Sequence, residues 1–250
     1  MNKLEALQQC TVDGTTIKLP NVTLDRKVYL EVKTALELIG GKWKGGKVGG
    51  FVFATDPTEL LQKVAGGEKV NPKKEFQFFG TPAELAKKMV AMADISPTSV
   101  ILEPSAGQGA IVDEILKVTT DGNMVCICEK MPINRDILMK KYDGKVEFLR
   151  VEDDDFLNHP DEVKYDSIIA NPPFSKNQDI EHIQKMYTLL QEGGTLVAIS
   201  STHWEHSQNN KERAFKQWLD VVGAYQEDIP AGAFKESGTS IATKLIMIQK

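Results

Sequence analysis

The sequence predicts an α/β protein in which a small α+β module precedes a doubly wound, mostly parallel sheet of seven strands. Apolar strand-like runs alternate with helical periods between residues 81 and 200. Two further strand-like runs follow residue 224 with only a loop between them. The first 75 residues lack this alternation and differ in charge, so we expect two domains, residues 1–75 and 76–250.

Within residues 1–75 the pattern predicts two short helices, a hairpin and a linker. Helical spacing of apolar residues ends at a Gly-Gly pair, and the glycine-rich run that follows leads into a strand-like Phe-Val-Phe. The predicted elements are a helix over 25–39, a hairpin over 40–53, a helix over 58–65 and a polar linker over 66–75.

The larger part of the chain predicts a regular series of strands and helices. Its first helix is expected to begin with Thr81 as N-cap and Pro82 at the first helical position. The predicted helices are 81–93, 109–117, 132–141 and 179–190. The predicted strands are 99–103, 124–129, 146–149, 165–170, 195–200, 225–229 and 243–248, of which the last two should form an antiparallel hairpin.

The length and composition are those of a soluble globular chain. Of 250 residues 41% are hydrophobic and 26% are charged, and no apolar run approaches the ~18 residues that a membrane span needs. Polar residues such as Lys3 and Glu5 interrupt the N-terminus, so we expect no signal peptide, no membrane partner and a cytoplasmic protein. Cys126 and Cys128 are too close for a Cys-x-x-Cys metal knuckle and are expected to be core thiols.

The net charge of −5 is distributed unevenly. Residues 1–75 hold 12 Lys and Arg against 9 Asp and Glu, a net charge of +3, whereas residues 76–250 hold 18 against 26, a net charge of −8. The larger part therefore lacks the broad basic face of proteins that hold duplex nucleic acid by charge alone. Any contact with nucleic acid is expected to be local or helped by a partner.

A glycine loop after the strand 99–103 is the first candidate for ligand binding, because ligands of doubly wound sheets sit beyond the carboxyl ends of strands. Its glycines let the backbone turn tightly and approach a ligand, although a bare Gly-x-Gly is also common in simple turns. Val112 stands where the dinucleotide fingerprint has its third glycine, which argues against NAD. The candidates in this loop are Glu103, Pro104, Ala106, Gly107 and Gly109.

Acidic residues end the next two strands. Glu129 follows Gly109 by 20 residues, and a carboxylate at that position can accept both hydroxyls of a ribose. After the third strand, Asp155 could accept from an adenine amino group while Phe156 packs on the base. The alternatives are a solvated acid at 129 and a solvated acidic loop at 152–155. The binding candidates here are Glu129, Lys130, Asp155 and Phe156.

Directly after the apolar strand 165–170 comes Asn171-Pro172-Pro173-Phe174. The prolines remove two amide donors and stiffen the loop, which leaves the Asn171 side-chain oxygen and the Pro172 carbonyl as fixed acceptors. Accepting from both N–H bonds of an amine on an aromatic ring draws its lone pair out of conjugation, so that it can attack a methyl group. Phe174 would stack on the base that carries the amine. The alternative is a rigid turn without chemistry.

Taken together, these motifs resemble those of the S-adenosylmethionine-dependent methyltransferases that act on exocyclic amines. The greatest resemblance is to the gamma-ordered adenine-N6 DNA methyltransferases, in which the cofactor motifs precede the catalytic one. It covers residues 76–250, and it includes Phe79-Gly80-Thr81-Pro82 in addition to the motifs above. It implies a Rossmann-like methyltransferase fold and an enzyme that moves a methyl group from S-adenosylmethionine to adenine-N6 in DNA.

The resemblance also implies a role for each motif. Thr81 and Pro82 would hold the methionine end of the cofactor, the glycine loop would let the cofactor pass, and Glu129 would bind its ribose. Asp155 and Phe156 would hold its adenine. The target amine would lie against the catalytic loop, which consists of Asn171, Pro172, Pro173 and Phe174.

Three alternatives to this activity stay open on the sequence: methylation of an RNA base amine, methylation of a protein glutamine, and a catalytically idle subunit that binds cofactor or nucleic acid. Members of this family that act alone on DNA usually carry a target-recognition domain after the catalytic one, whereas this sequence ends at Lys250. We therefore expect a nucleic-acid substrate, most naturally DNA, with a partner subunit that supplies target recognition.

Two further segments are candidates for contact with nucleic acid. The glycine-rich hairpin carries lysines around a tryptophan, which could track a phosphate backbone and stack on a base; alternatively the tryptophan packs on its own module. His203 follows the strand 195–200 and so lies on the ligand side. Its His-x-x-His spacing with His206 lacks supporting acids or cysteines, so we expect no metal. The contact candidates are Lys42, Trp43, Lys44, Lys47 and His203.

Overall fold

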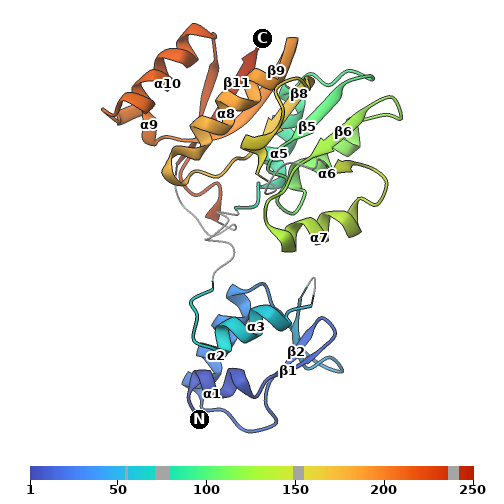
Figure 1. The fold of residues 1–250 in the computed structure, drawn as a ribbon, viewed down its shortest axis with the longest axis vertical. Coiled ribbons are helices and arrows are strands. Elements are labelled where there is room, and N and C mark those ends of the chain that lie inside the picture. The colour runs from blue at the N-terminus through green and yellow to red at the C-terminus, as the bar shows by residue number, and fades with distance from the viewer. Residues whose placement is uncertain (54–55, 71–78, 149–154, 236–241) are drawn as a thin grey trace. The chain divides into compact units, whose positions relative to one another are not determined.

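The computed structural model describes the chain except for residues 54–55, 71–78, 149–154 and 236–241 (Figure 1). The chain forms two compact units, Met1–Phe76 and Gln77–Lys250. The expected boundary at residue 75, most of the acidic run at 152–155 and the last residue of the strand expected at 146–149 lie outside the described residues.

In its described residues, the N-terminal unit is a small sheet with three helices. Its strands are antiparallel in the order β1-β2-β4-β3. The predicted helices α2 and α3 and the hairpin β3–β4 are confirmed, while the pattern missed α1, β1 and β2. The elements are α1 (Lys3–Gln8), β1 (Thr11–Asp13), β2 (Thr16–Lys18), α2 (Arg26–Leu38), β3 (Lys42–Lys44), β4 (Gly50–Val52) and α3 (Thr58–Ala65).

One face of this small sheet forms the core of the unit. Ile17 of β2 and Phe51 of β4 are register partners, and both are fully buried with Leu36 of α2 and Leu7 of α1. Because side chains alternate along a strand, the neighbours of Ile17 and Phe51 lie on the opposite face. The unit therefore has its own hydrophobic core on one side of the sheet.

The second unit contains the alternating series that the sequence predicts. Its helices are α5 (Ala83–Met92), α6 (Ala110–Val118), α7 (Pro132–Lys141), α8 (Gln178–Leu189), α9 (His203–His206) and α10 (Asn210–Val221), with short 3-10 turns η2 (Phe156–Asn158) and η3 (Ser175–Asn177). Its strands are β5 (Val100–Glu103), β6 (Met124–Ile127), β7 (Glu147–Phe148), β8 (Tyr165–Ala170), β9 (Leu190–Ser201), β10 (Tyr225–Ile229) and β11 (Thr243–Gln249).

The strands form one seven-stranded sheet in the order β10-β11-β9-β8-β5-β6-β7. Strands β7, β6, β5, β8 and β9 are parallel, and β11 runs antiparallel to both β9 and β10. The chain starts in the middle at β5, moves outward through β6 and β7, and then returns to β8 on the other side of β5. The predicted doubly wound fold is confirmed, and the strand order reverses between β5 and β8.

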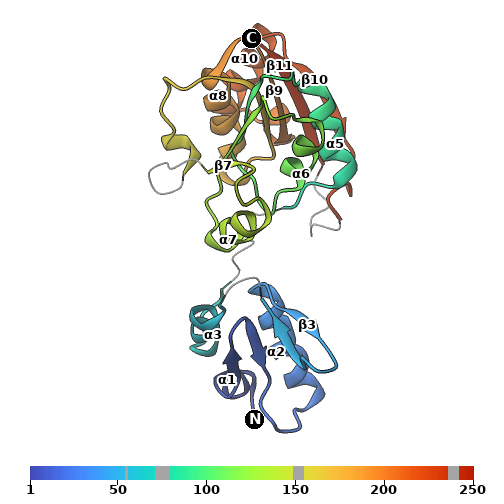
Figure 2. The same cartoon turned by 90° about the vertical axis from the view of Figure 1, so that its right-hand side faces the viewer.

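Helices cover both faces of this sheet (Figure 2). Adjacent strand residues point to opposite sides, so Ile101 packs with α5, α6 and α7, whereas Leu102 packs with α8 and α10. Cys126 and Cys128 are buried in the second of these layers, as predicted. Each helix among the described residues is too short or too polar to span a lipid bilayer.

Some details of the second unit differ from prediction. Pro82, not Thr81, occupies the N-cap position of α5, and no side chain caps that helix. Residues 203–206, for which the sequence pattern predicted no element, form the short helix α9. Helix α10 was missed altogether; its apolar positions are widely spaced among charged residues, and Phe215 and Leu219 anchor it to the core.

Candidate active site

The carboxyl ends of three neighbouring strands bring the predicted motifs together. β5 ends at Glu103, β6 ends two residues before Glu129, and β8 ends directly before Asn171. β5 pairs with both β6 and β8, so these three ends are adjacent at the point where the strand order reverses (Figure 1). That point is where open α/β sheets bind their ligands.

Backbone hydrogen bonds fasten the glycine loop to the end of β6. The amide of Cys128 donates to the Glu103 carbonyl oxygen at 3.0 Å, and the amide of Ala106 donates to the Cys128 carbonyl oxygen at 3.0 Å. Gly107 and Gly109 then adopt left-handed backbone conformations, with φ of 56° and 85°. Pro104, Ala106 and both glycines are buried.

Glycine is required at position 109 for a second reason. The Tyr142 hydroxyl donates to the Gly109 carbonyl oxygen at 2.8 Å, and a side chain built at Gly109 would overlap the Tyr142 ring. The single hydroxyl proton of Tyr142 is shared between the Gly109 carbonyl oxygen and Asp113 Oδ1 of α6, which lies 2.7 Å from the hydroxyl. The sequence pattern did not identify Tyr142, which supports the glycine loop although it lies 33 residues after Gly109 in the sequence.

Glu129 is held by two backbone amides. Gly107 donates to its Oε2 at 2.6 Å, and Met131 donates to its Oε1 at 2.7 Å. Burial raises the pKa of Glu129 to about 7 against these hydrogen bonds. Each carboxylate oxygen has a second lone pair, so a vicinal diol can still bind to the carboxylate.

Glu103 is the most deeply buried acid of the site, with 1% of its surface exposed. Burial and the nearby charge of Glu129 raise its pKa well above the ordinary value. Its Oε2 atom has no hydrogen-bond partner among the described residues. A buried oxygen without a protein partner at a ligand edge indicates that a polar group from outside the chain completes the site.

Asp155 and Lys130 form an ion pair between the two neighbouring loops, with Lys130 Nζ 2.7 Å from Asp155 Oδ2. Burial raises the pKa of Asp155, but the bonds from Lys130 and from the Leu157 amide outweigh this effect and lower it. Phe156 is only 2% exposed and packs against His182 in the core, so its ring anchors the loop from inside. Of the two neighbours Asp155 and Phe156, only Asp155 reaches the surface.

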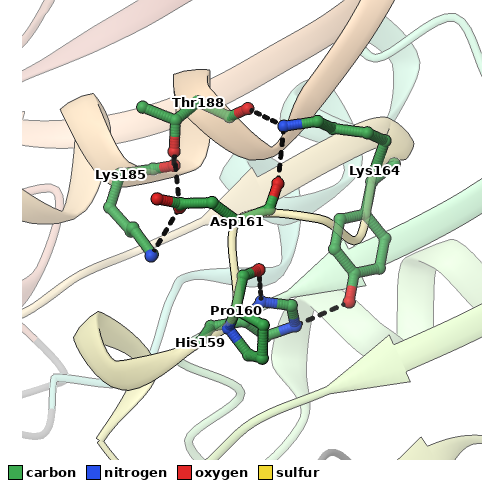
Figure 3. A network of polar contacts seen from close by, with 7 residues as sticks. His159, Pro160, Asp161, Lys164, Lys185 and Thr188 are labelled. Atoms are coloured by element: carbon green, nitrogen blue, oxygen red, sulfur yellow. Dashed lines mark hydrogen bonds and ion pairs between the residues drawn. The ribbon is translucent and has the colours of Figure 1, made fainter.

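The segment after this loop is tied to β8 and α8 (Figure 3). His159 bonds through Nε2 to the Tyr165 hydroxyl at 2.9 Å, and Lys185 of α8 pairs with Asp161 at 2.7 Å. Lys164 donates to the carbonyl oxygens of Asp161 and Thr188, each at 2.7 Å. Tyr165 begins β8, so this network fixes the return of the chain from the ligand edge to the opposite edge of the sheet.

The Asn171 side chain is fixed by two acceptors on the segment before α5. Its Nδ2 donates to the Phe79 carbonyl oxygen at 3.0 Å and to Thr81 Oγ1 at 3.1 Å. A carbonyl oxygen can only accept, so the contact with Phe79 determines which end of the amide is nitrogen. Both N–H groups are thereby used, and Oδ1 faces away from Phe79 and Thr81. Thr81 thus contacts the catalytic loop in place of its predicted capping bond.

A buried carboxylate joins the segment after the catalytic loop to the end of β9. Asp179 of α8 accepts from Ser201 N and Ser201 Oγ at 2.8 Å each and from Ser200 Oγ at 3.0 Å. Trp204 Nε1 donates to the same Ser200 hydroxyl at 2.8 Å. Sequence reasoning missed this network, because an acid in the first turn of a helix carries no signal of a buried role. His203 of α9 is exposed next to it.

The larger unit matches a known protein family. The model of the methyltransferase small domain matches residues 88–224, more than half of the chain. The chain belongs to this family.

Curated relatives of this methyltransferase are two enzymes from Haemophilus influenzae. The type II methyltransferases M.HincII and M.HindII are each 28% identical to it over 109 residues, which are 44% of this chain and 19% and 18% of theirs. The chain thus spans about a fifth of the length of the curated relatives that it matches.

Solved structures show the same fold. A type I restriction-modification methyltransferase subunit from Streptococcus thermophilus has a TM-score of 0.60 at 16% identity, covering 77% of this chain and 48% of that one. The M protein of the type I restriction enzyme EcoKI has a TM-score of 0.55 at 16% identity, covering 91% and 55%. An O-methyltransferase from Bacillus cereus in complex with SAH has a TM-score of 0.51 at 13% identity, covering 77% and 90%.

The family match supports S-adenosylmethionine as the cofactor of this methyltransferase. The site fits it: two left-handed glycines open the backbone beside β5, Glu129 presents carboxylate lone pairs, and Glu103 leaves a buried oxygen without a protein partner. Among the residues that the structure describes, no group of three His, Cys, Asp or Glu side chains is arranged to hold a metal.

The hairpin of the N-terminal unit separates its lysines from its tryptophan. Trp43 pairs with Phe51 across the strands and contacts its ring edge-on at 5.1 Å, on the face that forms the core. Lys42 and Lys44 alternate with Trp43 and so lie on the opposite face. Trp43 remains 44% exposed at the sheet edge. The two lysines of β3 and the tryptophan therefore lie on opposite faces of the sheet, and Lys47 lies in the turn.

Proposed function

We propose that this chain transfers a methyl group from S-adenosylmethionine to the exocyclic N6 amine of adenine in DNA. The observation that carries the proposal is the orientation of Asn171, whose Nδ2 is held by Phe79 and Thr81 so that Oδ1 faces the opposite way. This amide follows β8 directly and is one strand away from the glycine loop. An acceptor amine and the methyl donor would thus meet at adjacent strand ends.

The chain's contribution to the reaction is positioning. S-adenosylmethionine supplies an electrophilic methyl group when bound. Asn171 Oδ1 and the Pro172 carbonyl oxygen accept from the two N–H bonds of the amine, which directs its lone pair at the methyl carbon as the carbon–sulfur bond breaks. Pro173 stiffens this loop, and Phe174 stacks on the base. The methylated amine then loses its extra proton to water, so no strong base is needed.

For the cofactor, we propose that Glu129 binds the ribose and that Asp155 and Lys130 border the adenine, on a loop that the buried ring of Phe156 anchors. Thr81 and Pro82 border the methionine end, next to Asn171. Glu103, Pro104, Ala106, Gly107 and Gly109 form the loop along which the cofactor lies. In this arrangement the Lys130–Asp155 ion pair holds two of the cofactor-binding loops together.

For the acceptor, DNA is favoured by the relatives, since two are named as type II methyltransferases and two structures are parts of type I restriction systems. The catalytic unit itself is acidic, with a net charge of −8 over residues 76–250. Binding of a polyanion therefore calls for local cations or a partner subunit that supplies target recognition. We propose that the N-terminal hairpin contributes through Lys42, Lys44 and Lys47, and that His203 faces the acceptor.

The test is methyl transfer from radiolabelled S-adenosylmethionine to separate DNA, RNA and protein acceptors. We expect label in DNA with the wild-type chain and none with Asn171→Ala, which should still bind the cofactor. If only RNA or only protein were labelled, that molecule and not DNA would be the acceptor. Cofactor binding without transfer to any acceptor, in the presence of cell extract as a source of partner subunits, would overturn the proposal of an enzyme.

A further inference from the structure

The turn that follows the catalytic loop has an unusual backbone. Lys176 and Asn177, the second and third residues after Phe174, both lie in the left-handed region. Lys176 has φ of 56° and ψ of 25°, and Asn177 has φ of 60° and ψ of 34°. Left-handed residues with a side chain are disfavoured by a clash of Cβ with the backbone, and lysine lacks the local hydrogen bonding that eases asparagine into this region. Two in succession therefore need support from the surrounding structure.

That support comes from α10. Glu212 is 2% exposed, and its Oε1 accepts from Asn177 Nδ2 at 2.6 Å and from Asn209 Nδ2 at 3.2 Å. Glu212 and Asn177 are 35 residues apart in sequence. This hydrogen bond joins α10 to the turn that follows the catalytic loop. Glu212 thus holds Asn177 in its left-handed conformation, and this fixes the backbone at Lys176, the preceding residue.

The residue presented by this turn is a free cation. Lys176 is exposed, and within the described chain no ion pair or hydrogen bond of its ammonium is found. The nearby lysine of α10, Lys211, is in contrast paired with Glu181 of α8 at 2.7 Å. In a unit with an excess of acids, an unpaired lysine next to the catalytic loop attracts a negatively charged group of the acceptor.

We propose that Lys176 binds a backbone phosphate of the acceptor strand beside the extruded base, and that Glu212, through Asn177, is the positioning residue that holds Lys176 there. The inference rests on the proposed function, because it takes the acceptor to be a nucleic acid. An enzyme that modifies an extruded base must bind the sugar-phosphate backbone on either side of that base. The left-handed turn brings a cation to that backbone within two residues of the loop that holds the base.

The first experiment measures binding of a DNA oligonucleotide to the 250-residue chain over a range of salt concentrations, with cofactor present. Lys176→Ala should weaken binding and lower the slope of log K against log salt by about 1, since one phosphate contact is lost. Lys176→Arg should keep most of the slope. The control is Lys145→Ala, which removes another exposed charge, just before β7 at the amino ends of the parallel strands, and should leave the slope unchanged.

Lys176→Gly separates binding from folding. Glycine adopts positive φ without strain, so this variant should melt no lower than the wild type and still show the reduced salt slope. If Lys176→Ala and Lys176→Gly both bind DNA with the wild-type slope, the phosphate contact is refuted. Should the wild type transfer label to DNA in the same preparation, that result would leave the proposed function intact, so the two failures are distinguishable.

The positioning role of Glu212 is tested by asking whether the effects of Glu212→Ala and Lys176→Ala are additive. Glu212→Ala should raise KM for DNA and lower the salt slope as Lys176→Ala does, and the double variant should bind no worse than Glu212→Ala alone. Glu212→Gln keeps an oxygen for Asn177 and should restore KM. A Glu212→Ala variant that folds with the wild-type KM and slope would overturn this role, as would fully additive effects of the two substitutions.

Discussion

Asn171 Nδ2 lies 3.1 Å from Thr81 Oγ1, which joins the catalytic loop to the segment that enters α5 across 90 residues of sequence. The same nitrogen is 3.0 Å from the Phe79 carbonyl oxygen. The two contacts give the amide a single orientation before any substrate binds. Such preorganisation is worth most where a group must meet developing charge.

Removal of the Thr81 hydroxyl should loosen Asn171 without deleting it. We expect Thr81→Val to lower kcat about tenfold, the scale of about 1.4 kcal/mol for one lost neutral hydrogen bond, while Thr81→Ser retains the hydroxyl and most of the activity. Steady-state kinetics with labelled cofactor measure both variants. If the Val and Ser variants were equally active, the Thr81 contact would have no role in positioning the amide.

Glu129 should make the stability of the cofactor-free chain fall as the pH rises. Its pKa is about 7 in the fold because of burial, against an ordinary value of 4.5, so the folded state binds more protons between these limits. The linkage relation then predicts a loss of about 3 kcal/mol of unfolding free energy from pH 4.5 to above pH 7.

The control for this effect is Glu129→Gln, which cannot ionise and should lack that part of the pH dependence. Urea denaturation of both chains at pH 5 and pH 8 measures the difference. The Gln variant should gain stability relative to the wild type as the pH rises. Parallel profiles of the two proteins would show that burial does not disfavour the Glu129 charge.

Gly109→Ala should destabilise the second unit. Gly109 has φ of 85°, and a side chain there would overlap Tyr142. The two effects together should cost about 2 to 4 kcal/mol of unfolding free energy. Gly144→Ala is the matched control, because Gly144 has φ of 67° but open space around it, and should cost only about 1 to 2 kcal/mol. Equal losses in the two variants would rule out the Tyr142 contact as a constraint.

The two faces of the N-terminal sheet should respond to different assays. Replacement of Lys42, Lys44 and Lys47 by Ala should weaken DNA binding at every sequence and lower its salt slope, because phosphate contacts release counterions without reading bases. Trp43→Ala should instead lower the melting temperature, since its ring packs on Phe51. A Trp43 variant that melts normally but binds weakly would favour stacking on a base.

The sequence was sufficient for the elements with strong local signals. Pro132 opens α7 at the predicted residue, and the apolar run of β8 is bounded as predicted, because helix-starting prolines and buried strands depend little on distant residues. The glycine loop and the acids at strand ends follow from the same regularity. These local signals were enough to predict the sheet and the edge at which the candidate site lies.

Other features depend on contacts that no local pattern reports. The bonds of Thr81 with Asn171 and of Asn177 with Glu212 join residues 90 and 35 positions apart. Thr81 has the sequence signature of an N-cap, but its hydroxyl accepts from Asn171 and the capping bond is not made. The separation of Trp43 from Lys42 and Lys44 could be recognised only after β3 was known to be a strand.

The most direct test of the proposed reaction is to identify the methylated nucleoside. DNA incubated with the chain and methyl-labelled S-adenosylmethionine is digested to nucleosides and separated, with Asn171→Ala as the matched control. We predict label in N6-methyldeoxyadenosine with the wild type and at least a hundredfold less with the variant, whose cofactor affinity should be nearly unchanged. Label in another nucleoside, or equal label with both proteins, would contradict the assignment of Asn171 as the acceptor of the adenine amine.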